Sequence, residues 1–295
     1  MVAAKVFYYY PIKHFINALF RRKDLIPHLL WDSGAPPEGD VRRSRGFKQK
    51  VADNPKMNED PRNIAIIGTT DGVPFFDDQV RGCWPFFLRV ANLPDGLSTH
   101  MANVHMSMIV ANEHLTSDPL ASKLRREVKA PKSLQPQLTV LCDDLLDAYE
   151  NGVETTDYSC IKEDPSRIFR CHVVLLFWNG DYPAQAKISS THDKMCHWCT
   201  LQSMYAPEVN RSCWGHYRRY LPENHRLRLH AAYGPPERQP PPEHRTHADY
   251  CDSGRDNASY TGPPSRAPYK ESGVKQFLCW QRCRFSIWCG ASPLT

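Results

Sequence analysis

The sequence lacks long hydrophobic runs. None of its 295 residues belong to an uninterrupted apolar stretch of the roughly 18 residues that a membrane-spanning helix needs, so no membrane association is expected. The first twenty residues do not form the apolar segment of a secretion signal, because Lys5, Pro11, Lys13 and His14 interrupt them. We therefore expect an intracellular protein.

The sequence also lacks a strong excess of one charge. Thirty-seven Lys and Arg against 32 Asp and Glu give a net charge of +5, which permits a nucleic-acid partner without requiring one. Hydrophobic residues make up 41% and charged residues 23% of the chain, which excludes a disordered tail or a fibre. The length suffices for one large or two modest domains around a buried core.

Cysteine, by contrast, is abundant and odd in number, with 11 residues scattered along the chain. Without an export signal, a disulfide framework is disfavoured. We expect a subset of the cysteines to bind a metal and the others to act as small buried residues.

Apolar runs predict an α/β fold with a mixed α+β sheet. Three short runs separated by polar turns, residues 64–67, 84–90 and 104–110, predict an antiparallel meander. Leucines three or four residues apart predict a helix over 134–149. A fourth run, 171–178, is apolar on both faces and is typical of a central strand.

The segments outside this core have different compositions. Residues 12–23 predict a short amphipathic helix with a basic end. Residues 32–62 are polar and rich in Gly, Pro and charge, which favours a loop or extended connector. We divide the chain into an N-terminal helix and connector (1–62), the core (63–195), a Cys, His and Arg segment (196–233), and a Pro-rich linker with a C-terminal segment (234–295).

Two carboxylates follow predicted strands. Asp71 comes after the first strand and Asp181 after the fourth. If these strands are neighbours, the two acids converge, and paired carboxylates favour Mg²⁺ or Mn²⁺ of the kind that activates water or a 3′-hydroxyl in phosphodiester chemistry. The alternative is that Asp71-Gly72 is a turn dipeptide and that Asp181 precedes a proline turn.

A second set of candidate ligands has the spacing of a zinc site. Cys196 and Cys199 form one pair and, thirteen residues later, Cys213 and His216 form another, which predicts a structural zinc site with Cys3His ligands. Chance clustering is the alternative, and three nearby histidines are possible substitutes: His192, His197 and His225. A cytidine deaminase is excluded, because the His-x-Glu and the Pro before the first Cys are missing.

Cations alternate with aromatic rings after these pairs. This pattern suits a phosphate backbone and unstacked bases, although a solvated charged face is the alternative. The candidate nucleic-acid residues are Arg218, Arg219, Tyr220, Arg226 and Arg228.

Several motifs together resemble the transposases of CACTA-type (En/Spm-like) DNA transposons. The run from Asn63 into Asp71-Gly72-Val73-Pro74-Phe75-Phe76 is similar to the family's first catalytic strand and the turn after it. Gly180-Asp181-Tyr182-Pro183-Ala184 resembles its Asp-x-Pro-Ala motif. Cys196-His197-Trp198-Cys199 resembles its Cys-x2-Cys, and Gly215 to Pro222 resembles its His-Arg-Arg-x-Leu-Pro block with one residue inserted.

The resemblance implies an RNase H-like core with a zinc-binding insertion and a nuclear DDE-type enzyme. Such an enzyme binds transposon ends as DNA, can self-associate, uses two Mg²⁺ or Mn²⁺ ions and has no small-molecule substrate. Asp71 and Asp181 would be its first two acids. The third lies in the family on a later helix that this chain does not reach, since Leu294-Thr295 end it, and Asp252 and Glu271 lie in the polar linker.

We therefore expect a transposase-derived protein that is inactive as written. One alternative is a domesticated zinc-containing module that binds DNA or protein without catalysis. Another is an active fragment that borrows its last acid from a second polypeptide.

Overall fold

The computed structural model describes residues 7–31, 36, 38–52, 54–74, 82–114, 128–129, 131, 133–189, 204–206 and 211–213. The chain divides into two compact units, with the division between Ala184 and Gln185. In the second unit, β11 (Met204–Ala206) and β12 (Arg211–Cys213) form an antiparallel hairpin. Among the described residues, no helix is both long and apolar enough to cross a membrane.

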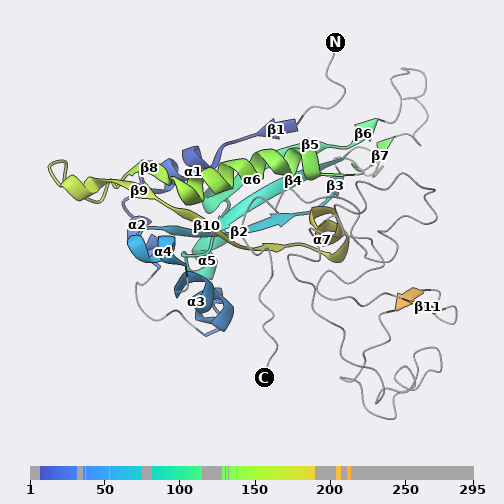
Figure 1. The fold of residues 1–295 in the computed structure, drawn as a ribbon, viewed down its shortest axis with the longest axis horizontal. Coiled ribbons are helices and arrows are strands. Elements are labelled where there is room, and N and C mark those ends of the chain that lie inside the picture. Colours follow the sequence, from blue (N-terminus) through green and yellow to red (C-terminus); the bar gives the residue numbers. More distant parts are fainter. Residues whose placement is uncertain are drawn as a thin grey trace, which may run out of the picture. The chain divides into compact units, whose positions relative to one another are not determined.

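A mixed sheet forms the centre of the first unit (Figure 1). Its order is β1 (Phe7–Tyr9), β5 (Val104–Ala111), β4 (Gly82–Val90), β2 (Ile64–Thr70) and β10 (Val173–Asn179), and the short β3 (Val73–Pro74) also pairs with β4. All pairs are antiparallel except β2 with β10, which is parallel. The predicted meander and the mixed α/β class are confirmed.

The fourth predicted strand has a different place from the one expected. β10 is the last strand of the described sheet rather than a central one. Its apolar residues reflect cover on both faces: Val173, Val174, Leu175 and Leu176 are all buried. A strand that is covered on both faces has a continuous apolar sequence even when it has a neighbouring strand on one side only.

Helices α1 (Ile12–Leu19) and α6 (Gln135–Glu150) cover one face of the sheet. α6 buries Leu138, Leu141 and Leu145, as its leucine spacing predicts. Asp144 ties the two helices to β1, because its Oδ2 accepts hydrogen bonds from the Tyr9 hydroxyl (2.5 Å) and the Ile12 amide (2.8 Å). Burial raises the pKa of Tyr9, so this hydroxyl stays a donor.

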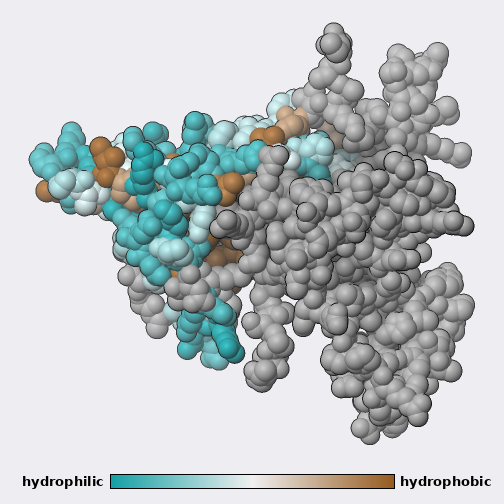
Figure 2. Space-filling view, in the orientation of Figure 1, coloured by the Kyte–Doolittle hydropathy of each residue, from teal (hydrophilic) through white to brown (hydrophobic). Residues whose placement is uncertain are grey.

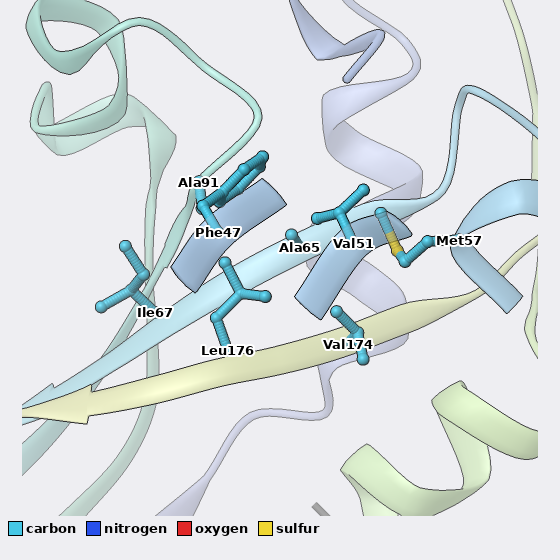
Figure 3. Packing of buried hydrophobic residues seen from close by; sticks show 8 residues of the cluster. All are labelled: Phe47, Val51, Met57, Ala65, Ile67, Ala91, Val174 and Leu176. Atoms are coloured by element: carbon cyan, nitrogen blue, oxygen red, sulfur yellow. The ribbon is translucent and has the colours of Figure 1, made fainter. Parts of the chain in front are cut away.

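The opposite face carries α3 (Arg45–Ala52) and α4 (Pro55–Glu59), and the prediction of a connector over 32–62 is wrong there. Phe47, Val51 and Met57 are buried against alternate residues of β2 and β10 in a cluster completed by Ala65, Ile67, Ala91, Val174 and Leu176 (Figure 3). Three well-spaced apolar anchors suffice to dock two short polar helices. Asn54 starts α4 as a side-chain cap before Pro55.

A two-stranded arm extends from the sheet (Figure 1). It consists of β8 (Val153–Thr156) and β9 (Ile168–Cys171), and near its tip Ile161 and Ile168 are 71% and 64% exposed. Figure 2 shows apolar spots on the otherwise hydrophilic surface of this arm. Arg62 joins the arm to the core through Asp157 and stacks over Phe169. The remaining described elements are α2 (Ile26–Leu29), η1 (Val41–Arg43), α5 (Asp95–Ser98), η2 (Met101–Asn103), β6 (Glu113–His114), β7 (Val128–Lys129), η4 (Pro165–Arg167) and α7 (Tyr182–Ile188).

Candidate functional site

The two candidate acids lie at the same edge of the sheet. β2 and β10 run side by side in the same direction (Figure 3). Thr69 of β2 pairs with Asn179 of β10. Asp71 and Asp181 each lie two residues beyond this pair, so neighbouring parallel strands end in one carboxylate each. The carboxyl ends of strands in an open sheet are where ligands commonly bind.

Asp71 lies in a break between two strand segments, not in a hairpin turn. β2 pairs with β4 as far as Thr70, and pairing resumes in β3 at Val73. The same register places Asp71 opposite Pro85, which has no N–H to donate. The chain therefore leaves the ladder at Asp71, whose side chain is exposed and whose Oδ1 accepts the Gly72 amide at 2.7 Å.

Asp181 caps the helix that follows β10. Its Oδ1 accepts a hydrogen bond from the Ala184 amide at 2.8 Å, which is the N-cap interaction of α7. The carboxylate is exposed, and no other side-chain partner of Asp181 occurs in the described part of the chain. The cap fixes one oxygen and leaves the other directed to no described protein group.

Packing just before the two acids sets the spacing of their strands. Gly68 lies opposite Trp178, and a Cβ on Gly68 would approach the indole Cε3 to 2.2 Å. The indole in turn packs on Phe86, with ring centroids 5.8 Å apart. Sequence reasoning did not single out Gly68 or Trp178, although a glycine inside an apolar strand commonly marks such a close approach.

The acidic pair can supply two oxygen ligands to a hard divalent cation. Mg²⁺ is commonly held by one or two carboxylates, with waters and substrate phosphates completing its shell. Within the ranges that the structure describes, no group of three or more His, Cys, Asp or Glu residues gathers around a possible metal position. The described residues thus fit part of a Mg²⁺ or Mn²⁺ ligand set.

Most of the predicted zinc and nucleic-acid residues lie outside the described residues. These are Cys196, Cys199, His216, Arg218, Arg219, Tyr220, Arg226 and Arg228, along with the Pro-rich linker and the C-terminal segment. Cys213 is described only as a backbone position in β12, where it pairs with Met204.

Comparison with known families finds one match. Residues 40–255, nearly three quarters of the chain, match the family described as transposase family tnp2. No curated protein and no solved structure matches the chain. The matched region contains both candidate acids and the four predicted zinc ligands.

Proposed function

Because the chain belongs to the transposase family tnp2, we propose that it derives from the enzyme of a cut-and-paste DNA transposon of the CACTA type. In this proposal an RNase H-like core binds transposon ends in the nucleus and presents Asp71 and Asp181 to the phosphodiester that is cut or joined. The two acids are the first two of a DDE set.

The strand order supports an RNase H-like core. In the central sheet, the antiparallel strands β2, β4 and β5 precede α6 and the β8–β9 arm along the chain. β10 then returns beside β2 and parallel to it. This order makes β2 and β10 neighbours although about a hundred residues separate them. A crossover through a helix is the usual way to join two parallel strands of one sheet.

The observation that carries the proposal is the register of these two strands. With Thr69 opposite Asn179, Asp71 and Asp181 lie at equivalent positions beyond the same edge. Both side chains are exposed, so each has an oxygen available to a ligand. An N-cap holds Asp181 in place, and the interrupted ladder at Pro85 releases Asp71 from the sheet.

Asp71 and Asp181 would hold the divalent ions. When bound, such ions supply Lewis-acid stabilisation of the charge that develops at a phosphodiester. The role of the protein residues is to fix the two carboxylates at one place and to orient the DNA against them. A further acid would have to come from outside the described residues, and the prediction that the chain alone is inactive stays a prediction.

The test combines cleavage with metal binding. The purified chain is incubated with Mg²⁺ or Mn²⁺ and a duplex carrying the terminal repeats of the element that encodes it, and Mn²⁺ binding is measured separately by calorimetry. No cleavage is expected from the chain alone; if it does cleave, Asp71→Asn and Asp181→Asn should lower cleavage by about three orders of magnitude, since the metal interaction contributes several kcal/mol. Both substitutions should also weaken Mn²⁺ binding.

Asparagine is the right replacement because it preserves the structure. It caps a helix about as well as aspartate, so Asp181→Asn removes charge and keeps the start of α7. Asp95→Asn, an exposed first-turn residue of α5, is the matched control. If Mn²⁺ binding depends on both acids and no cleavage occurs, the result supports the acidic pair as a metal site on an inactive chain. If neither substitution changes Mn²⁺ binding or cleavage, the proposal is rejected.

We also propose that Cys196, Cys199, Cys213 and His216 bind a structural zinc ion. The β11–β12 hairpin supports this, because it folds the chain back between the second and third ligands and pairs Cys213 with Met204, five residues after Cys199. Metal analysis should find about one zinc per chain, and Cys196→Ser should remove it. Unchanged zinc content in that variant would refute the assignment.

A further inference from the structure

A run of cations lies on η1 and α3, in the segment that sequence analysis assigned to a connector. Residues 42–50 contain Arg42, Arg43, Arg45, Lys48 and Lys50 and no acidic residue. Such a density would be unremarkable in a flexible loop. In the folded protein, however, the backbone of this run has a fixed position, because η1 and α3 are docked on the sheet.

Two kinds of cation occur in this run, and the structure separates them. Arg42 is structural: its guanidinium forms two hydrogen bonds with Asp40, at 3.0 and 2.9 Å, and one with the Asn92 carbonyl, at 3.1 Å. Arg43, Arg45 and Lys48 are exposed and form no ion pair with any acidic residue in the described ranges. Charge on these three side chains is therefore available to a partner.

The three exposed cations lie around one hollow. Arg43, Arg45, Lys48 and Gln49 line it together, and the surface over α3 is hydrophilic (Figure 2). α3 is amphipathic. Phe47 and Val51 are buried in the core, and the residues on the exposed side of the helix include Arg45, Lys48 and Gln49. Buried anchors hold the cationic face in place, so little order has to be gained when it binds.

The position of α3 relates this hollow to the acidic pair. α3 packs on Ala65 and Ile67 of β2 and on Val174 and Leu176 of β10, the same two strands that end in the acids. Ile67 precedes Asp71 by four residues, which is about 13 Å along an extended strand. One turn of duplex DNA is about 34 Å long, so one duplex can reach both places.

We infer that Arg43, Arg45 and Lys48 form a docking surface for the phosphate backbone of duplex DNA on the β2–β10 side of the core. The inference rests on the proposed function and adds residues other than the basic ones that follow Cys213 in the sequence. Three exposed cations with a neighbouring amide donor suit phosphate oxygens, which carry charge without sequence information. The surface positions DNA and does not read bases.

The test measures the salt dependence of DNA binding by the full chain. A variant with Arg43→Gln, Arg45→Gln and Lys48→Gln is compared with wild type by fluorescence anisotropy on a 30-base-pair duplex of arbitrary sequence between about 50 and 200 mM salt. Each lost phosphate contact lowers the slope of log K against log salt by about 0.9, so the slope should fall by about two to three. Affinity near 100 mM salt should fall by about tenfold to a hundredfold.

A matched control separates this surface from bulk charge. Lys13→Gln, Arg21→Gln and Lys23→Gln remove the same three charges from exposed positions on and after α1, which covers the other face of the sheet. This variant should keep the wild-type slope, and both variants should keep the wild-type circular dichroism and melting temperature.

The outcomes also separate this inference from the proposed function. If the wild-type chain binds DNA and the two triple variants lose affinity equally, the docking surface of Arg43, Arg45 and Lys48 is refuted. The same holds if neither variant loses affinity. The proposal for Asp71 and Asp181 is unaffected in both cases. If wild type binds no DNA, both fail. If the α3 variant loses binding to vesicles of anionic phospholipid and keeps its binding to DNA, the surface belongs to a lipid partner and the inference is overturned.

Discussion

The two ends of the β2–β10 strand pair are built in opposite ways. At the amino end of β2, buried side-chain amides hold strands, loops and helices together. At the carboxyl end, exposed carboxylates follow the strands, and their hydrogen bonds within the described part of the chain are local. The same pair of strands is thus tightly fixed at one end and left available to ligands at the other.

Asn92 is the centre of the amino end and is fully buried. Its Oδ1 accepts the Ala65 amide at 2.7 Å, and its Nδ2 donates to the Leu29 and Asn63 carbonyls at 2.7 and 2.9 Å. Asn63, also fully buried, accepts the His172 amide at 2.8 Å and so joins β2 to the start of β10. These bonds satisfy backbone groups that the sheet itself leaves unpaired.

This difference separates stability from chemistry along one strand pair. Removing a buried side-chain amide that forms all its hydrogen bonds lowers the free energy of unfolding. The backbone groups that it bonded to stay buried without a hydrogen-bond partner. Exposed acids contribute little to stability and are free to bind. Substitutions of the buried amides should therefore destabilise the protein, and substitutions of the exposed acids should spare the fold.

The largest expected effect on stability comes from Asn92→Ala. The substitution strands the Ala65 amide and the Leu29 and Asn63 carbonyls in a buried setting. We expect a loss of about 3–5 kcal/mol in the free energy of unfolding, measured by urea denaturation. Asn17→Ala, whose amide bonds to Lys13 within α1, should change it by less than about 0.5 kcal/mol. An equal loss of unfolding free energy in Asn92→Ala and Asn17→Ala would contradict the special role of the buried amides at the amino end.

Much of the sheet could be predicted from the sequence, because each of its main strands is an apolar run. The order of the runs also allowed the two acids to be placed at the ends of possible neighbours. The break at Asp71 is less visible in the sequence, since its cause is the register that places Pro85 opposite. A register between strands depends on packing across the sheet and not on a local pattern.

The missed helices show the limit of the same reasoning. α3 and α4 contain few apolar residues, and packing on β2 and β10 is their main source of stability. Two local indications were present: the i, i+4 pair Phe47 and Val51, and Asn54 before Pro55. The exposed cations Arg43, Arg45 and Lys48 were missed together with the helix. A run of charged residues forms a defined surface only when its backbone has a fixed conformation.

A smaller effect is expected from Gly68→Ala, near the carboxyl end. The added Cβ would overlap the Trp178 ring, so the ring or the strand must shift. We expect a loss of about 1–3 kcal/mol, and Gly68→Ala combined with Trp178→Leu should cost less than the sum of the single changes. Urea denaturation of the double-mutant cycle measures this coupling.

The control for Gly68 is Gly96→Ala in α5, where an added Cβ meets nothing within 4 Å. Alanine there should leave stability unchanged or raise it slightly. If Gly68→Ala, like Gly96→Ala, leaves stability unchanged, the carboxyl end is packed more loosely than the contact of Gly68 with Trp178 implies. If Gly68→Ala lowers Mn²⁺ binding, the spacing of β2 and β10 affects metal binding by Asp71 and Asp181.

The smallest effect concerns pH and returns to the amino end. Hydrogen bonds from Arg42 hold the pKa of Asp40 below its usual value, and Arg42 also donates to the Asn92 carbonyl. Because the pKa is lowered on folding, the stabilisation is fully present above the unfolded value of about 3.9 and is lost as the pH falls through the lower folded value. Acid should therefore weaken the amino-end network.

Asp40→Asn isolates this contribution. The gap in the free energy of unfolding between wild type and Asp40→Asn should be constant from pH 7 to about 5 and should shrink below about pH 4. Asp95→Asn is the matched control, because it removes an exposed carboxylate that has no ion-pair partner among the described residues. A gap of constant size down to pH 3 would mean that the charge on Asp40 does not stabilise the fold. Arg42 would then contribute through its bond to Asn92 and its packing alone.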